Sequence, residues 1–424
     1  MEGSFRNMNI WIFNHHAQGP DIAGGTRHYD LAKQLIAKGH HVTIFAAGFH
    51  YTLLKETVEY NSDGYKQEQI DGVDFVWVKT FPYEKNNIKR MVNILSYGWK
   101  LLFLIPKLSL SKPDVIIGTT VHPIAPVVGY WFAKKYKTPF IFEIRDLWPQ
   151  SFIDMGVWKK ESFVAKVFKA IEAFSVKKAD AIITLSPKTQ TYLLEEYGYK
   201  DVVYIPNSVD VESADKNKQL DFNHPTFETL KLLQAKKRKI YMFTGAIVQS
   251  NSIGMFIEVA KKIDIEEITI VLVGKGQLRQ KYEQMILQEK LGNIIFLDPV
   301  EKRMVPKLLS YADVLLLIQG NVQWGSSNKL YDYLCAKKPI ITSLYVKHND
   351  IVEEIGCGLS AQYENSDDMV AKIETMERLP QQQKQKMGEN GYNYVKKNSD
   401  IKIMAQKLEL LCKDLITKKE SIKR

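Results

Sequence analysis

Residues 9–46 decide the fold, and they read NIWIFNHHAQGPDIAGGTRHYDLAKQLIAKGHHVTIFA. The first six residues form an apolar run that predicts a buried strand, and a polar loop containing Gly24 and Gly25 follows. Residues 29–38 carry apolar side chains at helical spacing, and residues 41–46 form a second apolar run. A strand, a helix and another strand in this order predict two parallel strands joined by a crossover helix.

The same alternation of strands and helices continues through both halves of the chain. In the second half it restarts with a strand at 239–243, a loop at Thr244 and Gly245, and a helix at 252–262. The polar stretch 211–238 between the halves predicts a linker with a surface helix. The other predicted strands lie at 73–78, 115–117, 140–143, 181–184, 202–205, 268–273, 294–297, 314–318 and 339–342.

These patterns predict an α/β fold with two doubly wound, Rossmann-like domains that face each other across a cleft. We expect an N-terminal domain at 1–208 and a C-terminal domain at 209–395. A C-terminal helix at 396–424 is expected to pack back on the first domain. Ligands of such sheets bind beyond the carboxyl ends of the strands, which places the expected site in the cleft.

Composition narrows the class of protein and of partner. The chain has 424 residues, of which 45% are hydrophobic and 25% charged, so a disordered or collagen-like protein is excluded. Its formal net charge of +10 favours an anionic partner, which can be a phosphorylated ligand, nucleic acid or an acidic membrane face. The three cysteines are far apart, which predicts neither a disulfide framework nor a zinc cluster and favours a reducing compartment. The uncharged run 115–133 is interpreted as strand, loop and helix rather than as a membrane span.

Polar residues follow three predicted strands of the first half. Gly25 precedes a helix, where the backbone can approach an anion or simply form a tight turn. His122 can bond a sugar hydroxyl or transfer a proton, and a plain loop histidine explains it equally well. In the segment EIRDLWP, Arg145 can clamp an anion, and Glu143 and Asp146 can bind hydroxyls or polarise a nucleophile. An internal ion pair between Arg145 and one of these acids is the alternative.

The sharpest local feature of the second half is the loop and helix start GSSNKLYDYL at 325–334. Free backbone N–H groups at a helix start attract anions, and Lys329 adds a positive charge. Asp332, one turn into the helix, can accept hydrogen bonds from a ribose diol, whereas a capped helix without a ligand explains the same residues. Gly274 and Gly276 can let the backbone approach a nucleotide, but the missing third glycine argues against a dinucleotide fingerprint.

Two basic, apolar stretches lie in the first half, at 85–112 and 157–178. Basic amphipathic helices with aromatic anchors can rest on anionic lipid headgroups, and helices packed on the sheet with a solvated basic face give the same pattern. We favour the membrane surface over nucleic acid, because no nucleic-acid motif accompanies the charge.

The segments together resemble the retaining nucleotide-sugar glycosyltransferases of family 4, which have the GT-B fold, and in particular the bacterial members that build cell-surface polysaccharides. The resemblance covers nearly the whole chain and rests on the order and spacing of its marks. These are the stretch that opens at Asn9, FEIRDLWPQS, IPNSVD, FTGAI, LVGKGQL, YADVLLL and SSNKLYDYLCAKKPII.

The resemblance implies roles for the matching positions. Gly24, Gly25 and His122 would lie near the donor phosphates or the acceptor, and we assign His122, Arg145 and Asp146 to catalysis. Gly245 would face the diphosphate, while Gly274 and the loop near 297–300 would approach the nucleoside. The expected holders of diphosphate and ribose are Ser326, Ser327, Asn328, Lys329, Leu330 and Asp332.

Two departures from the family pattern matter. Many members have two glutamates separated by seven residues, and here the positions hold Trp324 and the shorter acid Asp332. Many also carry an arginine where this chain has Gln249. Lys329 is therefore the first candidate for the cation that receives the diphosphate.

The resemblance implies transfer of a hexosyl or N-acetylhexosaminyl group from a nucleotide sugar, with UDP as the expected nucleotide, without a metal ion or another cofactor. The expected acceptor is a polyprenyl-diphosphate-linked sugar of capsule, O-antigen or lipopolysaccharide biosynthesis. The enzyme is expected in the cytoplasm, peripheral on the inner face of the plasma membrane. The alternatives are an isomerase such as a UDP-sugar 2-epimerase, or a non-catalytic partner that binds nucleotide sugar.

Overall fold

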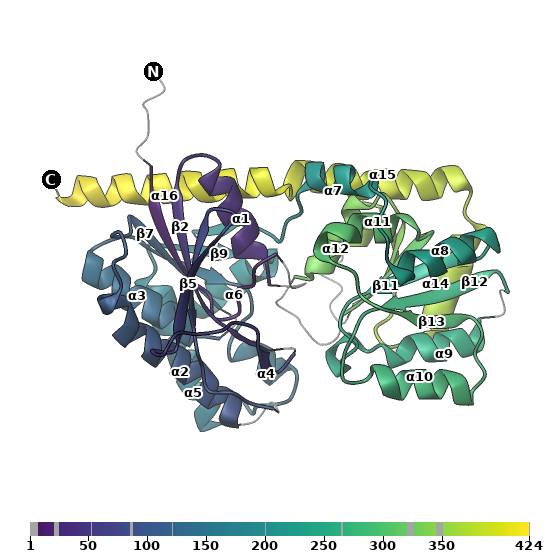
Figure 1. Ribbon diagram of the computed structural model, residues 1–424, viewed down its shortest axis with the longest axis horizontal. Coiled ribbons are helices and arrows are strands. Elements are labelled where there is room, and N and C mark those ends of the chain that lie inside the picture. The colour runs from purple at the N-terminus through teal and green to yellow at the C-terminus, as the bar shows by residue number, and fades with distance from the viewer. Residues whose placement is uncertain are drawn as a thin grey trace, which may run out of the picture. The chain divides into compact units, whose positions relative to one another are not determined.

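A computed structural model describes residues 7–20, 25–51, 53–84, 88–120, 122–199, 201–263, 266–319, 326–344 and 351–423 (Figure 1). The chain divides into two compact units. The first comprises Met1–Pro206, Trp324–Ser326 and Ile401–Arg424, and the second comprises Asn207–Gln323 and Ser327–Asp400. Gly24 and Trp324 lie outside the described residues.

The first unit contains an eight-stranded sheet in the order β10-β9-β8-β7-β1-β2-β6-β5. Neighbouring strands are parallel except β5 and β6, which pair antiparallel at one edge. The strands are β1 (Asn9–Phe13), β2 (His41–Ala47), β5 (Tyr65–Ile70), β6 (Val73–Val78), β7 (Val115–Thr119), β8 (Phe140–Ile144), β9 (Ala181–Thr184) and β10 (Val202–Tyr204). A separate short hairpin joins β3 (Phe49–His50) and β4 (Lys55–Glu56).

Alternate side chains of β1 enter two different cores, because helices cover both faces of the sheet. Ile10 and Ile12 pack in a cluster with α1 (Arg27–Ile36) and α16 (Ile401–Lys423). Trp11 and Phe13 pack on the other face with α2 (Ile88–Leu104) and α3 (Ile124–Tyr136). The strand is thus apolar on both sides, as is usual for a central parallel strand. The remaining helices of this unit are α4 (Gln150–Asp154), α5 (Phe163–Lys178) and α6 (Pro187–Tyr197).

The second unit contains a six-stranded parallel sheet in the order β13-β12-β11-β14-β15-β16. The strands are β11 (Lys239–Thr244), β12 (Ile268–Val273), β13 (Ile294–Leu297), β14 (Val314–Gln319), β15 (Ile340–Leu344) and β16 (Gly358–Ala361). The helices on one face include α7 (Val211–Lys218), α8 (Pro225–Ala235), α11 (Val305–Ser310), α12 (Asn328–Cys335), α13 (Ile351–Glu354) and α15 (Gln381–Asn398). The opposite face carries α9 (Gly254–Lys262), α10 (Arg279–Gln288) and α14 (Ser366–Arg378).

The predicted α/β class with two doubly wound sheets is confirmed, and one element of the prediction is wrong. The stretch 211–238 is not mainly a linker, because α7 and α8 place Val211, Phe227 and Leu230 in the core of the second unit. The uncharged run 115–133 forms β7, a loop and most of α3, as predicted. In the described part of the chain, no helix combines the length and apolarity needed to span a bilayer.

Candidate active site

In the first unit, polar residues gather where the strand order reverses. β1 pairs with β2 on one side and with β7 on the other, so its carboxyl end lies at the switch point of the sheet. Ligands of doubly wound sheets bind at such points. His15 and His16 follow β1, and Thr120 and His122 follow β7, so the fold itself brings these side chains together.

His122, a predicted catalytic residue, is fully buried and both its ring nitrogens bond within the protein. Its Nδ1 accepts the Ile124 backbone N–H over 3.3 Å, and its Nε2 lies 2.5 Å from His15 Nδ1. Burial, and then the charge of Arg90, lowers the pKa of His122 to about 3. The ring is therefore neutral near pH 7, which favours a positioning role over proton transfer.

Sequence reasoning missed His15 and His16. Unlike His122, these histidines keep ring nitrogens that have no hydrogen-bond partner among the described residues. The His15 ring stacks on the rings of His16 and Tyr97 at centroid distances of 4.4 and 4.5 Å. Burial and the neighbouring histidines lower the pKa of both rings well below 6.5. The signal that could have found them is their place directly after a central parallel strand at its switch point.

Glu143 forms an internal ion pair, but with Arg27 and His28 of α1 rather than with Arg145. Its carboxylate lies 2.6 Å from His28 Nε2, 3.0 Å from the Arg27 guanidinium and 2.7 Å from Thr119 Oγ1. Although burial alone would raise the pKa of Glu143, these partners hold it well below 4.5. Glu143 thus joins α1 to β8 and is occupied structurally.

Arg145 and Asp146 are half-buried beside the histidines. Thr120 Oγ1 accepts the backbone N–H of Arg145 over 2.9 Å and that of Asp146 over 3.3 Å, which fixes the turn after β8. Burial raises the pKa of Asp146, against the opposing charges of Arg145 and Arg90. Among the described residues, Arg145 Nε is buried without a hydrogen-bond partner.

Gly25 closes the loop that carries the histidines. Its φ is +73°, and a Cβ there would lie 2.9 Å from the carbonyl oxygen of His16. Its own carbonyl accepts the Gln18 N–H over 3.3 Å. The glycine is explained by this tight turn, which sets the backbone next to His16.

In the second unit, Gly245 and Gly274 bring the ends of β11 and β12 into backbone contact. Gly245 has φ +146°, and a Cβ on Gly274 would lie only 1.9 Å from the Gly245 carbonyl oxygen. A Cβ on Gly245 would lie 2.9 Å from Lys329 Nζ. Packing therefore requires glycine at 274, whereas at 245 the positive φ favours glycine, and the absence of a Cβ there leaves room for the lysine.

Lys329 is a half-buried cation at the start of α12. Its ammonium lies 4.5 Å from the Phe243 ring centroid and 3.5 Å from Asn251 Oδ1. Burial lowers its pKa to about 8, so most molecules carry the charge at pH 7. Ser327, at the N-cap position, makes no side-chain capping bond, so the predicted cap is not formed by this residue. A cation and an uncapped helix start together form a seat for an anion.

The other predicted donor residues are placed less uniformly. Asn328 is exposed at the helix start, whereas the Leu330 side chain is buried in the apolar core and can offer only its backbone. Ser326 groups with the first unit, whereas Ser327 groups with the second. Gln249 lines an open depression of about 280 Å³ with Ser252 and Tyr282.

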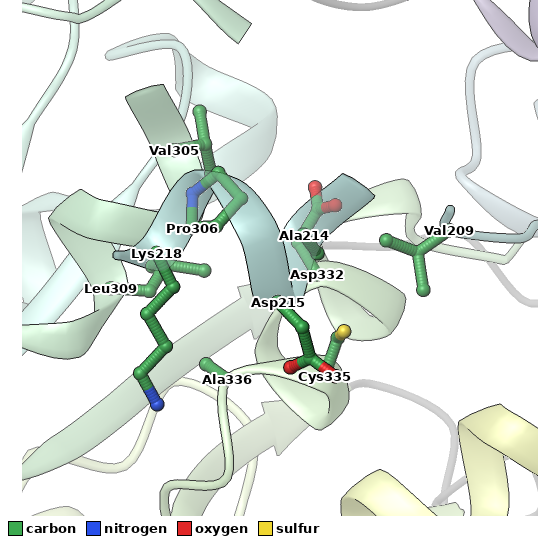
Figure 2. A pocket seen from close by; sticks show the side chains of 10 residues that line it. All are labelled: Val209, Ala214, Asp215, Lys218, Val305, Pro306, Leu309, Asp332, Cys335 and Ala336. Atoms are coloured by element: carbon green, nitrogen blue, oxygen red, sulfur yellow. The ribbon is translucent and has the colours of Figure 1, made fainter. Parts of the chain in front are cut away.

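Asp332 lines a small pocket between α7, α11 and α12. Figure 2 shows its carboxylate and that of Asp215 among the lining residues, which also include Lys218 and Cys335. The pocket holds about 20 Å³, room for about one water molecule. The structure thus places Asp332 within the second unit, one helical turn from Lys329, at the entrance to a space too small for a sugar.

The two halves of the chain match two glycosyltransferase families. Residues 24–213 match the family described as Glycosyltransferase Family 4, and residues 227–394 match Glycosyl transferases group 1. The chain belongs to the glycosyltransferases of the family 4 and group 1 type. This glycosyltransferase is 22% identical over 377 residues to a protein named for colanic acid biosynthesis, the glycosyl transferase WcaI of Escherichia coli K12, covering 85% of this chain and 90% of that one.

Solved structures show the same fold across nearly the whole glycosyltransferase chain. Sucrose-phosphate synthase of Thermosynechococcus elongatus superposes with a TM-score of 0.73 at 16% identity, covering 97% of this chain and all of that one. HepE of Anabaena, solved in complex with UDP-glucose, gives 0.65 at 15% identity, covering 96% and 99%. These likenesses show the GT-B fold. In the described residues, no group of three or more His, Cys, Asp or Glu side chains is placed to hold a metal ion.

Proposed function

We propose that this glycosyltransferase moves a sugar, with retention at the anomeric carbon, from a UDP-sugar to a lipid-linked sugar acceptor in bacterial surface polysaccharide biosynthesis. The observation that carries the donor class is Lys329, a half-buried cation beside a glycine loop and an uncapped helix start. A solved relative of this fold holds UDP-glucose. The relative named for colanic acid biosynthesis supports the polysaccharide assignment.

In the proposed reaction, the second unit receives the leaving diphosphate. As the glycosidic bond to the donor breaks, negative charge builds on the diphosphate, and Lys329 and the amides at the start of α12 stabilise it. The acceptor hydroxyl attacks the anomeric carbon from the face that the diphosphate leaves, its proton passes to the leaving diphosphate oxygen, and no covalent intermediate with the enzyme forms. The neutral histidines and Arg145 of the first unit position the acceptor.

The direct test is incubation of the purified full chain with radiolabelled UDP-sugars and bacterial membranes, with and without EDTA. We expect transfer of label to lipid with one UDP-sugar, unchanged by EDTA. An epimerised sugar in solution without acceptor would instead identify an isomerase. UDP binding without transfer or hydrolysis would identify a non-catalytic binding partner, and strict dependence on a metal ion would refute the metal-independent reaction.

We propose that the first unit holds the enzyme on an anionic membrane through the face made by α2, α3 and α5. The aromatic anchors are exposed: Trp99 by 66% and Phe163 by 81%, with Phe103 packed 4.6 Å from Trp99. These three helices lie together on one side of the sheet (Figure 1). Exposed lysines accompany them, namely Lys89, Lys107, Lys134, Lys135, Lys159, Lys160, Lys166, Lys177 and Lys178. Apolar side chains among cations suit the boundary between headgroups and acyl chains.

Vesicle sedimentation tests the membrane proposal. At low salt, the protein should sediment with vesicles that contain phosphatidylserine and not with purely zwitterionic ones, and added salt should release it. Trp99→Ser together with Phe163→Ser should weaken binding. Leu287→Ser removes an equally exposed apolar side chain, 76% exposed, from the second unit and should change nothing. Equal loss with the control, or binding that ignores lipid charge, would refute the proposal.

A further inference from the structure

The carboxyl end of β1 carries a ladder of stacked rings whose faces are occupied. His15 stacks on Tyr97 at 4.5 Å, and His16 stacks on His15 at 4.4 Å. On its other side His16 meets the Tyr51 ring at 4.8 Å. Because both faces of each histidine are covered, their ring nitrogens are the only atoms left for polar contacts at the ring edges.

A hydrogen-bond chain determines which nitrogen of His15 carries a proton. The Ile124 N–H donates to His122 Nδ1, so neutral His122 is protonated at Nε2. That N–H then donates to His15 Nδ1, so neutral His15 is protonated at Nε2. Among the described residues, His15 Nε2 is buried without a partner. The chain thus ends on a donor with no acceptor.

His16 and Arg145 also have buried nitrogen atoms without a hydrogen-bond partner among the described residues. His16 is 4% exposed, and neither of its ring nitrogens has a partner among the described residues. Arg145 Nε is likewise buried and without one. Buried polar groups are nearly always hydrogen-bonded, and leaving one unpaired costs about 1–3 kcal/mol. A cluster of several unpaired polar groups therefore requires an explanation.

The charge around these groups is positive. The fields of Arg90 and Arg145 both act on His16, and Arg90 also acts on His15 and His122. Asp146 is the acid near both arginines, and Glu143 is already compensated by Arg27 and His28. The positive charges of Arg90 and Arg145 therefore both act on the described side chains at this place. Ring N–H donors and a guanidinium fork match a group with several negative oxygens.

We propose that the edges of His15 and His16, together with Arg145, form a seat for a phosphoryl group of the acceptor in the first unit, distinct from the donor diphosphate at Lys329. This inference rests on the proposed function, because it assigns the acceptor's diphosphate to a site of that enzyme. A lipid diphosphate would place its phosphoryl oxygens at this seat and its sugar beyond it.

The test titrates inorganic pyrophosphate into the full chain saturated with UDP and follows the heat of binding. We expect a single additional site. His16→Phe keeps the stacked ring and removes both nitrogens, and Arg145→Gln removes the fork, so each should weaken pyrophosphate binding by about tenfold or more. Arg145→Lys should restore part of it. UDP affinity should stay within about twofold in all three variants.

Matched controls remove the same chemistry elsewhere. His41→Phe replaces an exposed histidine at the amino end of β2, and Lys33→Gln removes a cation that pairs with Asp71 on the surface. Neither should change pyrophosphate binding. The seat is refuted if the UDP-saturated protein takes up no pyrophosphate, or if His16→Phe and Arg145→Gln bind it as wild type does.

The outcomes separate this inference from the proposed function. UDP binding without pyrophosphate binding would overturn the seat and leave the donor site intact. Pyrophosphate binding that is unchanged in Lys329→Met, while UDP binding is weakened, would support the seat as separate from the donor site. Uptake of glucuronate in place of pyrophosphate, sensitive to His16→Phe, would overturn the phosphoryl assignment in favour of a carboxylate.

Discussion

At the scale of single residues, Lys329 shows how the surroundings of an ammonium group can bring its pKa close to neutral pH. Its neighbours are a ring, an amide oxygen and a glycine backbone, and none of them carries a negative charge. Burial therefore lowers its pKa to about 8 instead of the ordinary 10.5. In the proposed reaction, the diphosphate of the donor would supply a counter-charge for this ammonium.

UDP affinity should depend on pH through this lysine. The bound diphosphate raises the pKa of Lys329, so binding takes up a proton between the free and bound values. With respect to this lysine, affinity should be nearly constant below about pH 7 and should fall as the pH rises through about 8. Calorimetry in this range checks it. Lys329→Arg should flatten the profile, and an unchanged profile in this variant would mean that another group titrates.

Removing the charge should separate binding from folding. Lys329→Met keeps the length of the side chain and should weaken UDP binding by about 1.5–3 kcal/mol, the usual worth of a hydrogen bond to a charged group. Because the lowered pKa means that the fold disfavours the charge, the free energy of unfolding should not decrease. Urea denaturation measures the second quantity, and a large loss of stability would contradict the anion-seat interpretation.

At the scale of elements, Glu143 joins α1 to the sheet through a buried ion pair. Glu143→Gln should lower the free energy of unfolding by about 3–5 kcal/mol, because Arg27 stays buried without its counter-charge. Since its folded pKa is lowered, the stabilisation is present above the unfolded pKa and is lost as the pH falls toward the folded value. Denaturation at about pH 7 and about pH 4 checks both statements.

The packing of α16 on α1 can be tested with two neighbouring leucines. Leu408 is buried with Leu31 and Leu35, whereas Leu410 is 57% exposed. Leu408→Ala should cost about 2–5 kcal/mol of stability, and Leu410→Ala should stay within about 0.5 kcal/mol. Thermal and urea unfolding of both variants provide the comparison. Equal effects would show that α16 does not contribute to the core of the first unit.

The sequence predicts strands better than it predicts polar contacts. Central strands such as β6, β9 and β12 match their predicted bounds, because a run that is apolar on both faces has few other interpretations. The edge strand β5 is absent from the predictions, since its sequence YKQEQI is mostly polar. The helices α7 and α8 were hidden in a polar stretch because only one narrow face of each is buried.

The sequence predicts where the candidate site lies, but not which side-chain atoms are available there for polar contacts. The switch point follows from strand order, which the pattern indicates. The hydrogen bonds of both His122 ring nitrogens do not follow from the sequence pattern, because one joins His15, 107 residues away, and the other joins the Ile124 backbone. Likewise, the stacked rings come from Tyr51, Tyr97 and the loop after β1, which no local pattern connects.

At the scale of the whole molecule, the formal charge of +10 has two separate uses. Part of it lies on the half-buried side chains of Lys329 and Arg145 at the proposed anion sites, where salt screens it less than at the surface. The exposed lysines of α2, α3 and α5 are fully open to screening. Added salt should therefore reduce vesicle binding much more steeply than UDP binding, which sedimentation and calorimetry on one preparation can compare.

Apart from Trp324–Ser326, which group with the first unit, the second unit runs from Asn207 to Asp400. Near these two ends, Val209 forms a parallel bridge with Asp400, and its N–H donates to the Ser399 carbonyl over 3.2 Å. The second unit is thus an insertion whose entrance and exit touch. A segment that starts and finishes at one point can be exchanged without leaving a gap at its ends, so exchange of residues 207–400 with those of a related enzyme would test the proposed role of the second unit in donor binding.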